Sequence, residues 1–264
     1  MEALNEILLE ELSPPIAWLT FNRPANRNAM THALWKRLAA AMRRLAGEEA
    51  VRVIVLTGAG DQAFSAGADI TEIDQIRQSS ERITAYLEAV EGVMCAIEEA
   101  PQPVIAMLNG AAIGGGCEIA SACDLRVAST RARLGIPARN LGIVITLSDM
   151  RRLTALVGLG RAKEMLMTGR LVSADEALSM GLVNRVVAPE QLRPECEAMA
   201  LDMSNKAPET LRAAKIMGNR IAGGEATTDP NETFKLSIEG WHSDNFAEGI
   251  RAYIEGRAPV FRNR

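Results

Sequence analysis

The stretch at residues 109–124, NGAAIGGGCEIASACD, carries the strongest structural signal in the sequence. Three consecutive glycines, Gly114 to Gly116, follow the apolar run at 104–108 and open a segment of small residues typical of a closely packed helix. Bare backbone N–H groups at the start of a helix lie at the positive end of its dipole, which favours negative charge. The stretch therefore predicts a strand, a turn and a helix whose first turn can bind a developing anion.

Glu118 lies in the first turn of this expected helix. One interpretation is an acid that stabilises a helix N-terminus by about 0.3 to 1 kcal/mol. The other is a general acid or base, because a carboxylate on a closely packed helix costs free energy unless it has a partner or a purpose. In the second case Glu118 would act one turn away from the N–H groups of the glycines.

A second glycine loop lies upstream at 63–70, AFSAGADI, directly after an apolar strand-like run at 51–56. Gly67 stands between Ala66 and Ala68, and small residues allow a backbone to approach a ligand closely with its N–H groups turned inward. A tight turn without any function is the simpler interpretation, since glycine loops after strands are common. The loop alone does not decide between the two.

The rest of the chain predicts an α/β fold. Apolar or alternating runs predict strands at 7–12, 16–21, 51–56, 104–108, 125–128 and 183–187, the first two as a hairpin. Helical spacing predicts helices at 31–45, 81–99, 146–157, 161–167 and 173–180, and long helices from Glu190 onward. Because strands and helices alternate, we expect an α/β core at 1–195 and a helical C-terminal region at 196–264 that packs on a neighbouring subunit.

Charge and composition argue against nucleic-acid and membrane partners. The 264 residues carry a net charge of −4 with a pI near 5.5, so no overall charge attracts the chain to phosphate backbones. Basic residues at 36, 37, 43 and 44 are a candidate RNA patch, but a solvated helix face explains them as well. No apolar run approaches the length of a membrane span, and the N-terminal decapeptide is acidic, so we expect a cytoplasmic protein.

Cysteine and histidine usage gives no sign of a metal site. Four cysteines show no C-x-x-C pair, and His32 and His242 are the two histidines of the chain. We therefore expect reduced thiols and no bound metal. The glycines at 114–116 also lack the G-x-G-x-x-G spacing, with an acid further along, that a dinucleotide-binding loop needs.

The two glycine stretches, in this order, resemble the signature of the enoyl-CoA hydratase/isomerase (crotonase) superfamily. Four further stretches look like the same family: NRPANRNAM at 22–30, RVASTRARLGIPARNLG at 126–142, TGRLVSADEALSMGLVNRVV at 168–187 and FAEGIRAYIEGRAPVF at 246–261. The resemblance implies a crotonase-like spiral of β-β-α units with a helical C-terminal region. It also implies an acyl-CoA thioester as substrate, with coenzyme A entering as part of that substrate and no separate cofactor, and a homo-oligomer, either a trimer or a dimer of trimers.

The resemblance assigns roles to particular residues. It implies that the backbone N–H groups of Ala68 and Gly115 form an oxyanion hole and that Glu118 is the acid/base. The coenzyme A portion would run along the main chain at Arg23 to Ala25 and at Ala66, Gly67, Ala68, Asp69 and Ile70, close to Gly114. Arg23 could contact a phosphate, although a surface arginine needs no such role. Apolar residues that would form a wall of the acyl pocket, or pack as ordinary core, are Ile70, Ile73, Ile76 and Tyr86.

The chain departs from the family at the second carboxylate. Hydratases of the family carry a second glutamate at the position that Ala138 occupies here, in LGIPA at 134–138. A further acid position used by other members falls on Thr146, so both Ala138 and Thr146 would border the substrate without supplying an acid. Asp149 could replace the missing acid, but TLSD at 146–149 reads equally as a helix capping box.

The sequence therefore leaves three functions open. Hydration of a 2-enoyl-CoA is the simplest, with Glu118 serving both proton-transfer roles. A double-bond isomerase needs only one base and suits a single glutamate equally well. The third alternative is an acyl-CoA-binding member of the family with little or no activity.

Overall fold

The computed structural model describes residues 7–224 and 230–262. Within these residues there are two sheets, and six strands form the larger one. Their order is β1 (Leu8–Ser13), β2 (Ile16–Phe21), β3 (Val53–Gly58), β5 (Val104–Leu108), β7 (Leu125–Ser129) and β10 (Arg185–Val187). Strands β1 and β2 form the predicted antiparallel hairpin, and every other neighbouring pair is parallel. The α/β prediction is confirmed.

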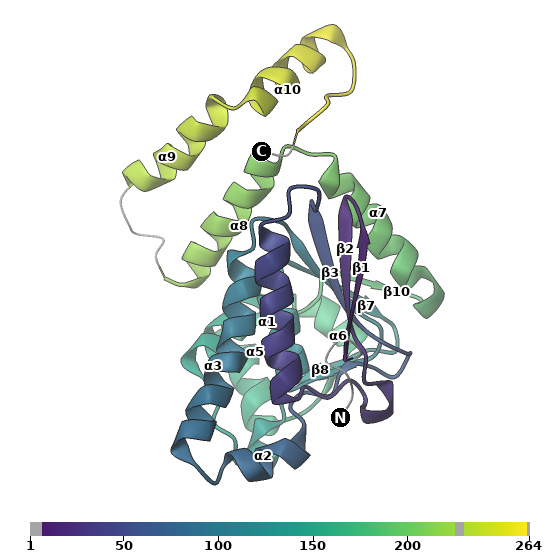
Figure 1. Cartoon of the computed structure of the whole chain (residues 1–264), viewed down its shortest axis with the longest axis vertical. Coiled ribbons are helices and arrows are strands. Elements are labelled where there is room, and N and C mark those ends of the chain that lie inside the picture. Colours follow the sequence, from purple (N-terminus) through teal and green to yellow (C-terminus); the bar gives the residue numbers. More distant parts are fainter. Residues whose placement is uncertain (1–6, 225–229, 263–264) are drawn as a thin grey trace.

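The two faces of this sheet are covered by different helices. Ile54 packs into the core that α1 (His32–Ala46) and α3 (Ser80–Glu99) share, whereas its neighbour Val55 packs beneath α7 (Leu192–Ser204). Successive side chains of a strand point to opposite faces, so a strand buried on both sides is apolar throughout. This explains why VIVL at 53–56 runs apolar without alternation, and Figure 1 shows the sheet between these helices.

A smaller four-stranded sheet was not predicted. It contains β4 (Ala63–Ser65), β6 (Ala111–Ile113), β8 (Arg133–Gly135) and β9 (Val172–Ser173). Strands of two or three residues are too short to show a period of two, so the sequence indicated loops at these places. Strands β4, β6 and β8 come shortly after β3, β5 and β7 along the chain. The glycine stretches at 63–70 and 109–124 include β4 and β6.

The order strand, strand, helix recurs through the core, as the resemblance implies. Strands β3 and β4 are followed by α2 (Ile70–Ile76) and α3, β5 and β6 by α4 (Gly115–Ala122), and β7 and β8 by α5 (Leu147–Thr168). The predicted helices at 146–157 and 161–167 are the two parts of α5, which is interrupted at Gly158. Short elements complete the core: η1 (Pro24–Asn26), η2 (Ala138–Asn140), α6 (Ala174–Ser179) and η3 (Pro189–Gln191).

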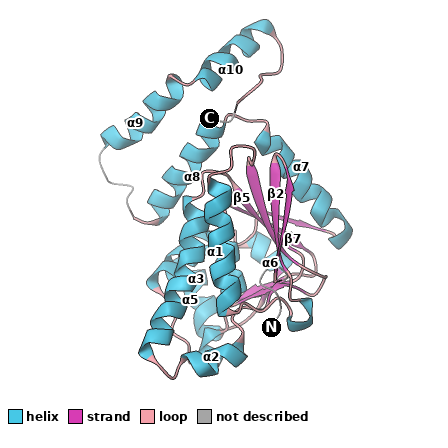
Figure 2. Cartoon of the chain, in the orientation of Figure 1, coloured by secondary structure: helices cyan, strands magenta, loops and turns pink. Residues whose placement is uncertain are grey.

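The C-terminal region is helical, as Figure 2 shows. Helix α8 (Pro208–Ala222) lies beside the core, while α9 (Pro230–Trp241) and α10 (Asp244–Glu255) extend away from it (Figure 1). The expected boundary at residue 195 falls inside α7, which packs on the large sheet, and residues 1–6 of the expected core lie outside the described part. None of the described helices is long and apolar enough to cross a bilayer.

Candidate active site

The loop at 66–69 is fixed by the segment before α1. Ala66 N donates to Arg27 O at 2.9 Å, Met30 N donates to Gly67 O at 2.7 Å, and Asp69 N donates to Met30 O at 3.0 Å. Gly67 N donates to Ser65 Oγ at 3.1 Å, so the amides on both sides of Ala68 have acceptors. Within the described chain, the N–H of Ala68 itself has no protein acceptor.

Gly67 allows this loop to approach the start of α4. Its φ is +89°, and a Cβ added there would lie 2.6 Å from Ile113 O and 3.2 Å from Gly115 N. A side chain would therefore clash with backbone, which cannot move away as a flexible side chain can. The tight turn expected from the sequence is present, and residues 66–68 of this loop line a cavity.

Helix α4 begins at Gly115 with bare backbone, as predicted. Gly114 N donates to Gly135 O at 2.8 Å, and the N–H of Gly115 has no acceptor among the described residues. A Cβ on Gly115 would stand 2.9 Å from the Trp35 ring and 3.8 Å from Ala68 N. Two amides without partners, Ala68 and Gly115, therefore lie close together at the positive end of a helix.

Both amides open onto a cavity of about 300 Å³ that is lined mainly by apolar side chains. One wall comes from α2 and α3 and another from the segment at 136–146. Residues of these walls include Ile70, Ile73, Ile76, Ile83, Tyr86, Leu87, Val90, Ile136, Leu141, Ile143 and Val144. Several of them at the rim are exposed, so the cavity is an apolar slot that is open to solvent.

Glu118 brings a carboxyl group into this cavity. Burial, followed by the negative charge of Asp149, raises its pKa to about 8, while Arg152 acts in the opposite direction. Its carboxyl makes no hydrogen bond to the described residues, and its remaining exposure faces the cavity. A carboxyl group that titrates near neutral pH beside two free amides is suited to proton transfer, because catalytic pKa values lie near the working pH.

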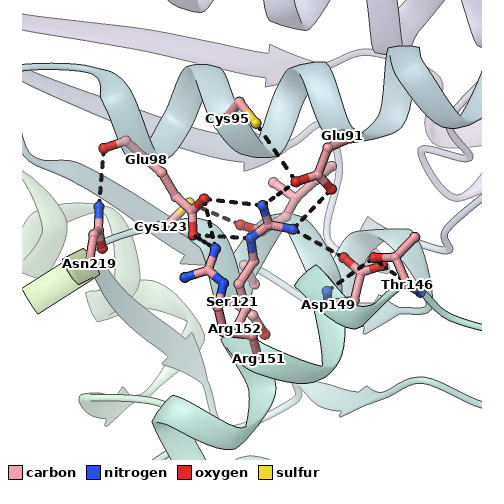
Figure 3. Close-up of polar contacts among 12 residues, drawn as sticks. Glu91, Cys95, Glu98, Ser121, Cys123, Thr146, Asp149, Arg151, Arg152 and Asn219 are labelled. Carbon is pink, nitrogen blue, oxygen red and sulfur yellow. Dashed lines mark hydrogen bonds and ion pairs between the residues drawn. The ribbon is translucent and has the colours of Figure 1, made fainter. Parts of the chain in front are cut away.

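Behind Glu118 lies a buried ion-pair network centred on Arg152 (Figure 3). Its guanidinium donates to Glu91 at 2.7 Å, to Glu98 at 3.0 Å and to Asp149 at 3.3 Å. Arg151 adds two bonds to Glu98, at 2.9 and 3.1 Å. The network fixes the positions of Glu91 and Asp149, which both line the cavity, and its hydrogen bond from Arg152 holds the pKa of Glu91 below the usual range.

Asp149 forms the capping box that the sequence allowed. Thr146 Oγ1 donates to Asp149 Oδ2 at 2.6 Å and accepts from Asp149 N at 3.1 Å, which caps α5. The same carboxylate lies at the edge of the cavity, so it also affects the site through its charge. Its role as a cap is confirmed, whereas a role in proton transfer stays untested.

Most of the residues singled out in the sequence come together here. Those that line the cavity are Ala66, Gly67, Ala68, Ile70, Gly114, Gly115, Glu118, Ala138 and Thr146. Arg23, Ala25 and Asp69 do not line it. Arg23 Nη1 pairs with Asp69 at 2.9 Å, and Asp69 caps α2, so both have structural partners, while Ala25 is exposed on η1. The place expected for a second acid, Ala138, carries only a methyl group.

Sequence reasoning missed the contributions of Glu91 and Arg152. In the sequence, Glu91 is one of several acids in the helix expected at 81–99, and nothing distinguishes it from the others. Its partner Arg152 lies 61 residues further along the chain. No local pattern pairs residues so far apart. Tyr86 was identified only as an apolar wall, although its hydroxyl accepts a hydrogen bond from Trp35 Nε1 at 3.2 Å.

Comparison with known proteins gives one consistent picture. A family model described as Enoyl-CoA hydratase/isomerase matches residues 11–264. The chain is 36% identical to a short-chain-enoyl-CoA hydratase of Clostridium acetobutylicum, over 99% of both chains, and 35% identical to a crotonyl-CoA hydratase of Syntrophomonas wolfei, over 98% of both. The crystal structure of an enoyl-CoA hydratase from Bacillus anthracis superposes with a TM-score of 0.88 at 32% identity, covering 98% of this chain and all of the other.

Proposed function

Because the chain belongs to the enoyl-CoA hydratase/isomerase family, we propose that it adds water across the double bond of a 2-enoyl-CoA thioester. One observation carries the proposal: the carboxyl of Glu118 faces the same apolar cavity as the free N–H groups of Ala68 and Gly115. A mainly apolar cavity suits an acyl chain, and Glu118 with the two free amides supplies the polar groups that the reaction needs.

The two amides would hold the thioester oxygen. Ala68 N and Gly115 N can donate to the same oxygen, whose negative charge grows as the thioester becomes an enolate. Donors that are already in position cost no reorganisation in the transition state, and one such donor contributes about 3 to 4 kcal/mol. The side chains of Ala68 and Gly115 take no part in this binding and need only be small.

Glu118 would move the proton. With Ala138 where a second acid would stand, its carboxylate takes a proton from the added water as the water oxygen bonds to C3. The electrons of the double bond pass to the thioester oxygen, and Glu118 then delivers the same proton to C2. The protein ends in its starting state, so one carboxylate can complete the cycle.

Double-bond isomerisation is the second candidate, and Ala138 is the observation that favours it. A 1,3 proton shift needs a base that removes a proton and returns it on the same face, with an enolate held in between. Glu118 and the two amides provide these groups without any need to hold a water. The two reactions differ only in whether water enters the cavity.

We further propose how the whole substrate and the assembly are arranged. Coenzyme A would enter as part of the substrate along Arg23 to Ala25 and residues 66–70, with the acyl chain in the cavity between the wall of α2 and α3 and the segment at 136–146. Helices α9 and α10 expose large apolar side chains, among them Trp241 and Tyr253, that a neighbouring subunit would cover in a trimer or a dimer of trimers. A cytoplasmic location also stays a prediction.

A turnover assay separates the candidates. Purified protein is incubated with 2-enoyl-CoA and 3-enoyl-CoA substrates of several chain lengths, and the products are analysed by mass spectrometry. A gain of 18 mass units, the general signature of added water, supports the hydratase. A shifted double bond without added mass makes the protein an isomerase. Tight binding without turnover of either substrate contradicts both.

A further inference from the structure

Several polar side chains that line the cavity already make hydrogen bonds to other groups of the protein. Thr146 Oγ1 donates to Asp149 and accepts from the Asp149 amide, so it has no proton left to donate. The carboxylate of Asp149 accepts from Thr146 and from Arg152 at 3.3 Å. Thr146 therefore cannot donate to a water beside the substrate, and three protein donors already occupy the Asp149 carboxylate.

Two charged groups of the cavity wall are also engaged. Glu91 accepts from Arg152 at 2.7 and 3.3 Å, and its bond to Arg152 holds its pKa below the usual range. Arg77 Nε donates to Asp74 at 2.8 Å on an exposed part of α2 and its C-cap. Their charges are neutralised by protein partners.

Tyr86 is different, because its bond to Trp35 leaves its own proton free. The indole nitrogen of Trp35 is a donor only, so Tyr86 Oη must be the acceptor in the 3.2 Å bond. The hydroxyl proton of Tyr86 has no acceptor within the described part of the chain. Burial raises the pKa of Tyr86 to about 12, so the hydroxyl stays protonated and acts as a donor at neutral pH.

Trp35 also fixes where that donor lies. Its indole Nε1 donates to Tyr86, and Cζ2, which is two bonds from Nε1 on the same edge of the ring, stands 2.9 Å from the position of a Cβ on Gly115. This edge of Trp35 therefore links the Tyr86 hydroxyl to the start of α4, and Trp35 and Tyr86 line the same cavity as Glu118. The negative charge of Glu118 acts on Tyr86 as well, as expected for groups that share a small space.

Among the described side chains that line the cavity, Glu118 is thus a carboxyl acceptor with no hydrogen-bond partner, and Tyr86 is a buried hydroxyl whose proton is free to be donated. A water molecule needs both. We propose that Tyr86 is a catalytic residue whose hydroxyl donates a hydrogen bond to the oxygen of the water that adds to C3, in place of the acid absent at Ala138. The proposal rests on the proposed hydratase function.

The step balances without any further reactant. The water oxygen, held by the Tyr86 hydroxyl, forms the bond to C3, and one water proton passes to the Glu118 carboxylate. The π electrons move to the thioester oxygen and return to form the C2–H bond with that proton. Tyr86 keeps its own proton throughout. In the reverse direction its hydrogen bond stabilises the departing hydroxyl group.

Tyr86→Phe tests this role, and Tyr253→Phe is its matched control, because Tyr253 lies on α10 outside the cavity and the substitution keeps its apolar ring. Two reactions are measured for each variant. The first is water addition to a short 2-enoyl-CoA. The second is exchange of the C2 proton of a saturated acyl-CoA in D₂O, which needs Glu118 and the oxyanion donors but no added water.

Tyr86→Phe is expected to lower kcat for water addition roughly 10- to 100-fold, the effect of losing one hydrogen bond to a charged transition state. C2 exchange should stay within about twofold of the wild type, and Tyr253→Phe should match the wild type in both reactions. Equal losses in both reactions for Tyr86→Phe, or unchanged water addition, would overturn the assignment. A wild type that exchanges C2 protons but adds no water would instead show that the proposed hydratase function is wrong.

Discussion

Asp149 and Glu118 face one cavity from different helices, and the charge of Asp149 adds to burial in raising the pKa of Glu118 to about 8. Asp149 also accepts hydrogen bonds from Arg152 and Thr146. A helix cap therefore contributes to the raised pKa of Glu118, the proposed acid/base. The pH dependence of the reaction follows from this relationship.

Activity should rise with pH up to about 8. Every proposed reaction begins with Glu118 as a carboxylate, and the ionised fraction of a group with a pKa of about 8 grows roughly tenfold per pH unit below that value. A kcat/KM profile from pH 6 to 9 should rise and then level off. A flat profile, or one that falls with pH, would contradict this role.

Asp149→Asn should move that rise to lower pH. The asparagine keeps a cap acceptor but removes the negative charge, so the midpoint of the kcat/KM profile should fall by roughly 0.5 to 1 pH unit. Asp175→Asn, at an exposed acid of the first turn of α6, is the control and should leave the midpoint unchanged. An unmoved midpoint in Asp149→Asn would show that its charge does not act on Glu118.

Gly67→Ala should disrupt the oxyanion hole. The added Cβ would lie 2.6 Å from Ile113 O, which forces the loop and Ala68 N away from Gly115, and kcat should fall about 100- to 1000-fold. Gly60→Ala is the control, because Gly60 has a similar φ of +78° but no neighbour closer than 3.6 Å to its added Cβ. If both variants lose activity equally, backbone strain rather than the clash is responsible.

Ala138→Glu should increase water addition. Position 138 lines the cavity, so a carboxyl there provides a second proton-transfer group, worth about tenfold or more in kcat. Ala138→Gln supplies the same shape without an acid and should show no gain. If both substitutions act alike, packing rather than proton transfer explains the effect.

Arg152→Met should destabilise the fold. The side chain is 3% exposed, and its loss leaves Glu91, Glu98 and Asp149 as neighbouring carboxylates without their shared cation. Breaking a buried ion pair from one side costs about 3 to 5 kcal/mol, so Tm should fall by roughly 10 °C. Arg161→Met, on an exposed part of α5, is the control, since surface pairs contribute about 1 kcal/mol or less. Equal Tm values for the two variants would contradict a structural role for the network.

The sequence predicts those parts of the site that depend on local pattern. Bare amides at the start of α4 follow from three glycines at the start of an expected helix, whereas the choice of Ala68 and Gly115 as the two donors depends on the family resemblance. The short strands β4, β6, β8 and β9 escaped prediction because two or three residues show no periodicity. The pairing of Arg152 with Glu91 joins α3 to α5, and such contacts are set by packing alone.

The most direct test of the account is C2 proton exchange by Glu118→Gln. In D₂O the wild type should place deuterium at C2 of a saturated acyl-CoA, since the carboxylate removes the proton and the two amides hold the enolate. Glu118→Gln should lose this exchange at least 1000-fold yet bind the thioester with similar affinity, and Glu88→Gln, at an exposed position of α3, should behave as the wild type. Exchange that persists in Glu118→Gln would show that another group moves the proton.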